Sequence, residues 1–505
     1  MGEVFTLLGE GFARALTPEN LGFAFLGVLI GSLVGVLPGI GPITAISLLI
    51  PLSFGLDPTS GLILLSGIYY GSMYGGSTTS ILIRTPGEVA SIVTTLDGYE
   101  MAKQGRAGPA LATAAIGSFV AGTVSTVGLM LLAPALATVA ISFGAAEYFL
   151  LMLLALSMVS SLTTGSALKA LIATLFGLAI AMVGIDPQSS VPRFTFGILE
   201  LNDGIDFALV AIALFALPEA FLNMARRSAA RPPEPQRIEG SILMTREDWR
   251  RSLGPYGRGS ALGFFIGVLP GIGPTLASFL SYAMERRLSR HPERFGRGAI
   301  EGVAGPETAN NAAVGGAMVP LFTLGIPGSA TTALLLFVFI MYGLQPGPQM
   351  FDTNSQLIWA IIASMYVGNA MLLILNLPLV GVFARLLKTP PVPLYTGVLA
   401  FSVLGAYALN FNRFDLLLLF GFGIVGYLMQ RYGFPLAPAV LALVLGELIE
   451  QNLRRALSIS DGDLTAFVQR PISLVLIALI LLVAVLPPVL RLLRARRTAA
   501  RGRTT

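Results

Sequence analysis

The sequence predicts an all-α polytopic membrane protein made of two inverted-topology repeats. Of the 505 residues, 54% are hydrophobic and only 12% are charged, which is typical of chains that cross a membrane many times. The octapeptide Gly-Val-Leu-Pro-Gly-Ile-Gly-Pro occurs twice without a change, at residues 35–42 and 267–274, which indicates a duplication. Basic residues fall in opposite loops of the two halves, as is typical of inverted repeats.

Each octapeptide interrupts an apolar run. Its two prolines remove amide donors and its three glycines relax the backbone, so no continuous helix passes through it. In lipid such an interruption is tolerated only where protein or a water-filled cavity satisfies the freed backbone groups. Paired interruptions at corresponding positions of two repeats mark the binding site of many secondary transporters. We therefore expect the binding site beside the two octapeptides.

The first repeat is predicted at residues 21–224, after an interfacial helix at residues 1–20. The apolar pieces on both sides of the octapeptide are short for a bilayer, which needs about 20 residues, so they predict a re-entrant hairpin. The next apolar run begins at Gly61, is interrupted at Thr85-Pro86-Gly87-Glu88 and leads to a polar loop at residues 97–108, which predicts a broken helix. Full-length helices are expected at residues 109–132, 148–162, 167–184 and 207–224.

An arginine-rich linker at residues 225–258 separates the repeats, and the positive-inside rule makes it cytoplasmic. The second repeat is predicted at residues 259–453. A connection and a last transmembrane helix follow at residues 454–490, and a basic cytoplasmic tail at residues 491–505. With about five crossings per repeat and the last helix, the chain is predicted to cross the membrane about 11 times.

The charge of equivalent loops reverses between the repeats. Residues 54–60 hold no Lys or Arg, whereas residues 286–297 hold five arginines. The next loop contains Lys103 and Arg106 in the first repeat, but residues 343–356 of the second contain no basic residue. We therefore expect the loops at Asp57 and Gln345 outside, and those at Gln236 and His291 inside. Four arginines do not fit this predicted topology, because they would lie outside: Arg193, Arg413, Arg454 and Arg455.

Polar residues gather beside the interruptions. Helix ends there present amides to an anion and carbonyls to a cation. Asn310 and Asn311 have no counterpart in the first repeat, and an asparagine pair supplies oxygens for sodium and amide donors for a carboxylate. Close helix packing and hydrogen bonding between helices are the alternative roles. The candidate substrate site comprises Gly39, Gly41, Ser77, Thr78, Thr79, Arg84, Pro86, Gly87, Gly271, Gly273, Asn310, Asn311, Gly328 and Ser329, and the candidate sodium site comprises Asn310, Asn311, Thr79 and Gly325.

Several charged residues have competing interpretations. Arg84 is costly at membrane depth, and it either binds a substrate carboxylate or pairs with Glu88. Glu307 ranks below the two asparagines, because a place at the cytoplasmic mouth is its alternative. Glu219 and Glu447, near the ends of matched helices, are interpreted as carboxylates at the membrane interface.

The composition excludes several function classes. The chain has no cysteine, and its single histidine, His291, lies in a polar loop, so no thiolate metal site and no histidine proton relay is expected. The net charge of +5 is attributed to orientation signals and not to nucleic-acid binding. No phosphate-binding Gly-Lys-Ser/Thr loop is present, so the energy source is expected to be ionic, with no cofactor beyond Na⁺ or H⁺. Moving a dianion inward against about 100 mV costs about 4.6 kcal/mol, which two monovalent cations cancel.

Several motifs occur together in one order: the repeated octapeptide, Gly-Gly-Ser-Thr-Thr-Ser before Thr85-Pro86-Gly87-Glu88, Asp97-Gly98-Tyr99, Pro306-Glu307-Thr308-Ala309-Asn310-Asn311 and Gly325-Ile326-Pro327-Gly328. Together they resemble the large, TctA-type membrane subunit of bacterial tripartite tricarboxylate transporters, from about Leu16 to Leu490. The resemblance implies a cation-coupled importer of carboxylates such as citrate, working by alternating access in the lipid of the inner membrane. It also implies two partners, a small membrane subunit and a periplasmic solute-binding protein. Arg84 departs from the family pattern, where an amide such as Asn is expected.

Two other functions were weighed. A membrane-embedded enzyme, such as an intramembrane hydrolase, is disfavoured because the apolar segments hold no paired Asp motif and no His cluster. No catalytic residue is therefore assigned. A passive channel is disfavoured because the broken helices would close a pore midway.

Overall fold

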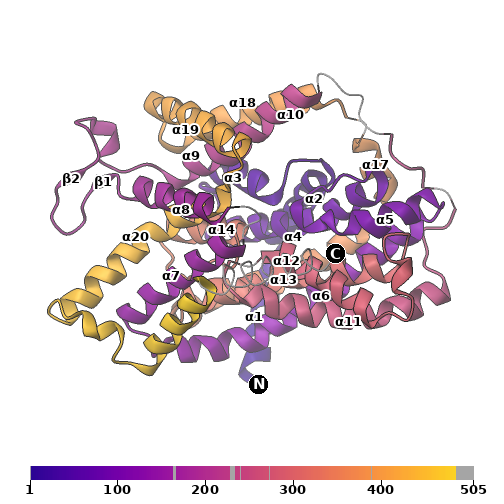
Figure 1. The fold of residues 1–505 in the computed structure, drawn as a ribbon, viewed down its shortest axis with the longest axis horizontal. Helices are drawn as coiled ribbons and strands as arrows, with labels where there is room; N and C mark the ends of the chain where they lie inside the picture. The colour runs from indigo at the N-terminus through magenta and orange to yellow at the C-terminus, as the bar shows by residue number, and fades with distance from the viewer. Residues whose placement is uncertain are drawn as a thin grey trace, which may run out of the picture. The chain divides into compact units, whose positions relative to one another are not determined.

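The computed structural model describes residues 2–162, 166–227, 234–238, 240–271, 273–387 and 389–484. These residues are almost entirely helical (Figure 1), which confirms the helical part of the predicted fold class. Within them, seven helices are long and apolar enough to span a membrane. The chain forms two compact units, one of Met1–Ala140 with Asp206–Arg431 and one of Ile141–Ile205 with Tyr432–Thr505.

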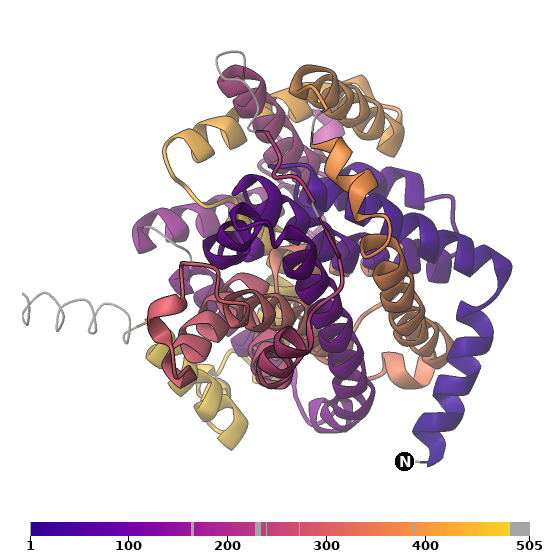
Figure 2. The ribbon, with the colours of Figure 1, turned by 90° about the vertical axis from the view of Figure 1, so that its right-hand side faces the viewer.

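The first unit holds both octapeptides. Its helices are α1 (Gly2–Ala15), α2 (Pro18–Val36), α3 (Pro42–Ser53), α4 (Pro58–Ile83), η1 (Val89–Ile92), α5 (Thr94–Lys103), α6 (Ala107–Ala140), α9 (Phe207–Ala211), η3 (Ile212–Ala216), α10 (Leu217–Arg227), α11 (Arg246–Val268), α12 (Gly273–Leu288), η4 (Pro292–Arg294), α13 (Glu301–Leu324), α14 (Ala330–Met341), α15 (Met350–Thr353), α16 (Ser355–Asn376), α17 (Val380–Leu386), α18 (Pro391–Asn410) and α19 (Arg413–Arg431). Helices α2 and α11 each end just before the proline of an octapeptide, as predicted. Near its N-terminus, which Figure 2 marks, the chain packs α1 beside α16. Gly11 of α1 contacts the backbone of Trp359 in α16.

Helices α4 and α13 form the centre of the first unit. Every residue from Thr59 to Ile83 of α4 and from Gly302 to Thr323 of α13 is buried. Protein therefore surrounds both helices, so their polar side chains do not meet lipid. This is the condition under which polar groups and broken helices are tolerated at membrane depth.

Glycines spaced four residues apart let α2 approach α4 and α11 approach α13. A Cβ added to any of them would collide with backbone atoms of the partner helix. Small residues at this spacing allow helix backbones to pack closely in membranes. The two sets are Gly27, Gly31 and Gly35 on α2, and Gly259, Gly263 and Gly267 on α11. The duplication seen in the sequence is thus also a duplication of helix packing.

The second interruptions also correspond. The C-cap residues of α4 and α13, Arg84 and Gly325, both adopt the left-handed conformation, with φ of 57° and 65°. Beyond these ends, Gly87 packs against the carbonyl of Gly35, and a Cβ on Gly328 would lie 3.2 Å from the carbonyl oxygen of Gly267. Each second interruption therefore rests on the octapeptide of its own repeat.

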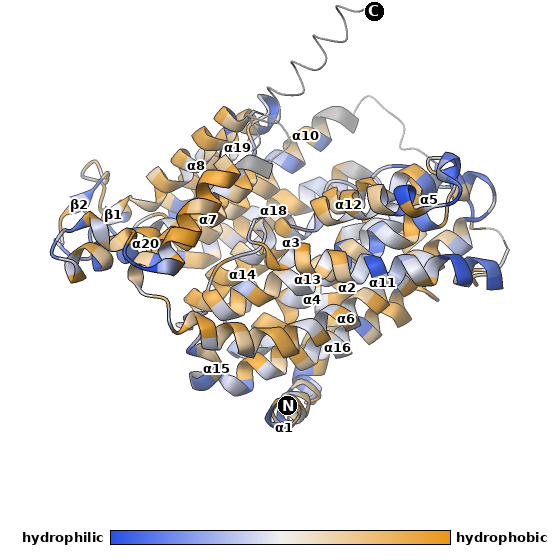
Figure 3. Ribbon diagram, turned by 60° about the horizontal axis from the view of Figure 1, so that its bottom comes forward, coloured by the Kyte–Doolittle hydropathy of each residue, from blue (hydrophilic) through white to orange (hydrophobic). Residues whose placement is uncertain are grey.

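The polar loops of the first unit gather in two groups. The buried Asp97 accepts hydrogen bonds of 2.8 Å from the amides of Gly296, Gly298 and Ala299, and the same region holds the Arg106–Asp248 ion pair. Figure 3 shows hydrophilic residues at α5 and at the neighbouring end of α11. In the other group, the Tyr342 hydroxyl donates to the Ser53 carbonyl at 2.5 Å. The loops predicted inside therefore lie together, as do the two predicted outside.

Two segments differ from the sequence-based expectation. Residues 97–108 were expected to form a loop, but Thr94–Lys103 is a helix and α6 begins at Ala107. The polar composition suggested a loop, yet Gly98 packs between side chains of Ile81 and Val303, which holds α5 in place. Within the predicted linker, residues 246–258 are the first turns of α11, capped by Thr245 and Asp248. The predicted tail at residues 491–505 and residues 485–490 of the last helix lie outside the described residues.

The second unit contains α7 (Ala145–Leu162), α8 (Ala167–Ala181), the short strands β1 (Gly184–Ile185) and β2 (Pro192–Arg193), the 3-10 turns η2 (Leu199–Leu201) and η5 (Leu464–Phe467), α20 (Leu436–Ile459) and a helix at Pro471–Ala484. The two strands pair antiparallel. Two of the arginines that did not fit the predicted topology form ion pairs in this unit: Arg193 pairs with Glu450 at 2.6 Å, and Arg454 pairs with Asp186 at 2.6 Å. Hydrogen bonds from Arg454 and from backbone amides hold the pKa of Asp186 well below its usual range.

Candidate functional site

Glu307 on α13 is the polar centre of the first unit. Its carboxylate accepts hydrogen bonds from the Ser77 hydroxyl on α4 and from the Thr94 hydroxyl at the start of α5. The Asn310 amide adds a longer contact of 3.4 Å. Glu307, Thr94 and Asn310 are completely buried, and Ser77 is 3% exposed. Glu307 is therefore not at a solvent-facing mouth; it joins polar groups from both repeats.

The two predicted asparagines extend this cluster. Asn311 donates to the side-chain oxygen of Asn310 at 2.6 Å and to the Ser118 hydroxyl of α6 at 2.8 Å. Hydrogen bonding between helices, the alternative that the sequence left open, is thus part of what Asn311 does. In the part of the chain that the structure describes, no ion pair reaches Glu307, whereas Glu301 and Glu285 are paired with arginines.

Glu88 is a second buried carboxylate close to the first. Its Oε2 accepts a hydrogen bond of 2.7 Å from the Ala90 amide and caps η1. Its Oε1 is buried and has no hydrogen-bond partner among the described residues. The Glu88 Cγ lies 2.9 Å from where a Cβ on Gly76 would stand, one residue before Ser77.

Arg84 does not take part in this cluster. Its side chain is exposed, and its guanidinium lies 5.8 Å from the centre of the Tyr99 ring. No ion pair joins Arg84 to Glu88 in the described part of the chain, so the predicted structural pairing is not observed. The left-handed backbone explains the position: Asn and Gly tolerate that conformation better than Arg, and Gly325 occupies the equivalent place.

The second interruption meets α4 nearer its N-terminus. The Tyr69 hydroxyl lies 3.2 Å from the Ser329 hydroxyl, which caps α14 together with Thr332. Tyr69 precedes Gly76 by about 10 Å along the helix. Because the late part of α4 meets the early part of α13 through Ser77 and Glu307, while Tyr69 meets Ser329, α4 and α13 run antiparallel.

Contacts also cross between the hairpins and the interruptions. The Gly271 amide donates to the Gly328 carbonyl at 3.0 Å, and Gly273 lies close to Ser329. The Ser278 hydroxyl of α12 donates to the Ala90 carbonyl at 2.8 Å, just after the first repeat's interruption at Pro86 and Gly87. The second hairpin therefore contacts the broken helices of both repeats.

The four residues of the candidate sodium site are not brought together. Thr79 donates to the Val36 carbonyl at 2.6 Å and closes the end of α2, and the neighbouring Thr78 is also buried. Gly325 follows the far end of α13, about 21 Å along the helix from Asn310. One ion cannot contact both, so this set does not form a single coordination shell.

The first octapeptide is held by residues that the sequence did not place there. Gly39 has φ of 88°, and a Cβ on it would collide with the Glu219 carboxylate and lie 3.0 Å from the Asn223 amide. The Tyr395 hydroxyl donates to the Pro38 carbonyl at 2.9 Å. Glu219 was interpreted as an interface carboxylate, whereas the structure places it against the octapeptide. Its position follows the π-helical segment η3, a feature common at functional sites.

Glu447 and Gly41 have fewer close neighbours than Glu219 and Gly39. Glu447 lies in the second unit, is exposed and accepts a hydrogen bond of 2.9 Å from Gln451. At Gly41, which precedes α3, an added Cβ would meet no atom within 4 Å.

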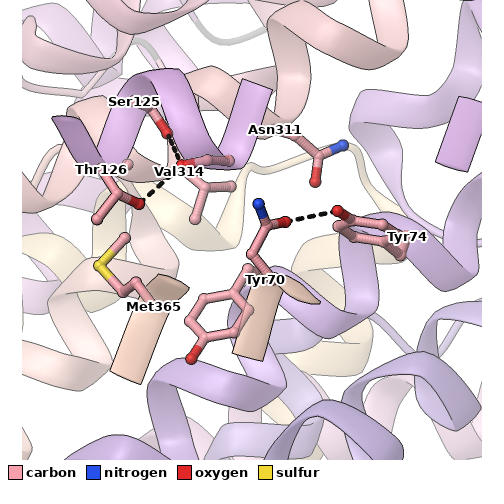
Figure 4. Close-up of a pocket in the computed structure, with 10 residues that line it drawn as sticks. Tyr70, Tyr74, Ser125, Thr126, Asn311, Val314 and Met365 are labelled. Atoms are coloured by element: carbon pink, nitrogen blue, oxygen red, sulfur yellow. Dashed lines mark hydrogen bonds between the residues drawn. The ribbon is translucent and has the colours of Figure 1, made fainter. Parts of the chain in front are cut away.

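A small cavity adjoins the cluster (Figure 4). Its volume is about 20 Å³, enough for a water molecule, and Asn311 contributes to its wall. The Tyr74 hydroxyl donates to Asn369 at 2.5 Å, whereas the buried Tyr70 hydroxyl has no hydrogen bond in the described structure. The cavity is lined by Tyr70, Tyr74, Gly122, Ser125, Thr126, Asn311, Val314, Gly315, Met365 and Asn369.

Two duplicated helix pairs with paired interruptions around a buried polar cluster are an arrangement typical of membrane transporters. The chain belongs to the tripartite tricarboxylate transporter TctA family, whose model matches residues 21–441. It is 49% identical, over 97% of this chain and 98% of the relative, to an Agrobacterium vitis protein described as an uncharacterized 52.8 kDa protein in the TAR-I ttuC′ 3′ region. It is also 48% identical, over 44% of this chain and 93% of the relative, to an Agrobacterium vitis protein of the TAR-II ttuC′ 3′ region. No solved structure matches the chain.

Proposed function

We propose that this chain is the large transmembrane subunit of a tripartite, binding-protein-dependent secondary transporter. It imports organic di- or tricarboxylates by symport with sodium ions or protons. Family membership supports the class of protein. The observation that carries the proposal is the buried cluster in which Ser77, Thr94 and Glu307 bring the two repeats together beside the interrupted helices.

Backbone amides at the octapeptides supply the anion-binding part of the proposed site. Helix α3 begins directly after Gly41, which offers no side chain to cap the free amides, and α12 begins at Gly273. Such helix N-termini favour a carboxylate. The proposed substrate contacts are Gly39, Gly41, Gly271 and Gly273, with Ser77, Thr78, Gly87, Gly328 and Ser329 beside them. Arg84 is left out because its side chain is exposed.

The transport cycle is proposed to follow from inverted symmetry. The antiparallel course of α4 and α13 and the separate gathering of two groups of loops support two inverted repeats, and about 11 crossings of the inner membrane stay a prediction from the sequence. The loops at Gly55 and Gln345 then face the periplasm, where the solute-binding protein delivers substrate. A tricarboxylate does not fit the cavity of about 20 Å³ beside Asn311, and alternating access is proposed to widen this region.

The proposal is tested by uptake into proteoliposomes that contain this chain and its small membrane subunit, with the solute-binding protein outside. Labelled di- and tricarboxylates are offered with an inward sodium gradient, an inward proton gradient or neither. We expect accumulation only with a cation gradient and only when the solute-binding protein is present. High-affinity, gradient-independent uptake by this chain alone, or no uptake of any carboxylate by the complete system, would contradict the proposal.

A further inference from the structure

The cluster around Glu307 consists almost entirely of oxygen ligands from three helices. Ser77 contributes a hydroxyl from α4, Thr94 a hydroxyl from α5, and Glu307 a carboxylate from α13. Asn310, one helical turn after Glu307, has a side-chain oxygen that accepts one hydrogen bond from Asn311 and keeps a second lone pair. Each hydroxyl that donates its proton to Glu307 keeps its lone pairs. A set of carboxylate, hydroxyl and amide oxygens suits a hard metal cation.

The charge of the cluster is uncompensated. Glu88 and Glu307 are both buried carboxylates, and neither pairs with a Lys or Arg of the described chain. A buried charge requires a partner, because its desolvation is otherwise costly. The side chains that do carry positive charge nearby are committed elsewhere, Arg258 to Glu285 and Arg251 to Glu301.

Glu88 gives a second, independent indication. Its side chain is 8% exposed, and its Oε1 lacks any hydrogen-bond partner in the described structure. A buried polar atom of this kind is costly unless a group absent from the protein itself binds it. Glu88 packs against Gly76, the residue that precedes Ser77 on α4.

We propose that Glu307, Ser77, Thr94 and Asn310, with Glu88 as the second carboxylate, bind one sodium ion, and that this ion is the coupling cation. The inference rests on the proposed symport function, and it replaces Thr79 and Gly325 by residues that the structure brings together. The ion neutralises the acidic pair and links the α4–α5 segment of the first repeat to α13 of the second. Its release would leave the pair repelling, so ion occupancy favours the arrangement in which the two repeats are in contact.

The test is thermal unfolding of the purified full-length chain in detergent, without substrate. NaCl replaces KCl at constant ionic strength and constant pH. We expect the midpoint to rise with sodium and not with potassium, because a ligand that binds only the folded state stabilises it. Glu307→Gln should abolish the rise. Ser77→Ala and Thr94→Val, which keep the carboxylate, should each raise the half-maximal sodium concentration about tenfold or more.

Glu447→Gln is the matched control, since it removes one carboxylate from an exposed position in the other unit, and it should leave the sodium response unchanged. The proposal is overturned if sodium and potassium act alike on the wild type, if the sodium response survives in Glu307→Gln, or if the half-maximal sodium concentration of Thr94→Val equals that of the wild type. A midpoint that responds to lower pH but never to sodium would equally overturn it, in favour of a proton. Because no substrate is used, these results stand whether or not carboxylate uptake is found.

Discussion

Gly39 and Gly41 lie two residues apart in the first octapeptide, but they adopt different backbone conformations. Gly39 adopts φ of 88°, where residues with a side chain are strained, and it faces Glu219 and Asn223. Gly41 has φ of −82° and open space around it. Only the first of these glycines is required by the conformation of the turn, a distinction that the repeated sequence does not reveal.

Gly39→Ala is therefore expected to destabilise the protein by about 1–2 kcal/mol from the backbone conformation alone, with a further loss where the methyl group displaces the Glu219 carboxylate. Gly41→Ala, the matched control, should change stability by less than about 1 kcal/mol, and in the stabilising direction, because it restricts the unfolded chain. Thermal unfolding of both variants in the same detergent measures the difference. Equal midpoints would show that the turn at Gly39 does not depend on glycine.

The pairing of α11 with α13, like that of α2 with α4, depends on close backbone approach. A Cβ on Gly263 would collide with the carbonyl of Ala309, an atom that cannot move without shifting α13. Gly257 lies on the same helix, but a Cβ there would meet no atom within 4 Å. Two glycines of one helix therefore carry opposite expectations.

Gly263→Ala should force the helices apart and destabilise the protein by about 1–3 kcal/mol, the usual cost of overpacking. Gly257→Ala should instead stabilise it by about 0.5–1 kcal/mol, because alanine is the better helix former. The free energy of unfolding of the two variants, compared with the wild type, decides between these signs. Destabilisation by both substitutions to the same extent would mean that the close approach is not what makes Gly263 necessary.

For the molecule in its membrane, the two groups of loops carry a prediction about sidedness. Loops at Gly55 and Gln345 should face the periplasm, and those at Arg237 and His291 the cytoplasm, as the charge pattern indicates. All four positions are exposed, and the chain has no cysteine of its own. Single cysteines can therefore be introduced at each without a background signal.

A membrane-impermeant maleimide added to cells with a permeable outer envelope should label Gly55→Cys and Gln345→Cys. It should label Arg237→Cys and His291→Cys only after the inner membrane is opened. Labelling of all four in opened membranes serves as the control for accessibility. If positions 237 and 291 react in sealed cells, then either the predicted orientation of the protein in the membrane is wrong or the two repeats are not inverted.

The sequence predicted most of the helical segments and both kinds of interruption, because proline and glycine act locally on the backbone. It also pointed to Ser77 and Asn310, since one lies beside an interruption and the other breaks the symmetry of the duplication. It did not show that Thr94 and Glu307 meet, because such a contact depends on packing between repeats more than 200 residues apart. Gly325 was misplaced as a ligand for a related reason: the uninterrupted length of α13 separates it from Asn310.

The glycine-lined pairs α2–α4 and α11–α13 have a mechanical consequence. Within each pair the two backbones are in contact, so neither helix can slide without the other, and the two helices move together as one rigid pair. Between the two helix pairs the described contacts include the hydrogen bond from the Ser77 hydroxyl of α4 to the Glu307 carboxylate of α13, which water can replace during a movement. Sliding should therefore be concentrated at the polar interface between the two helix pairs, as small shear displacements of one rigid pair against the other. The two helix pairs are built alike and run in opposite directions. They should therefore move in the same way whichever end of the polar interface between them opens first.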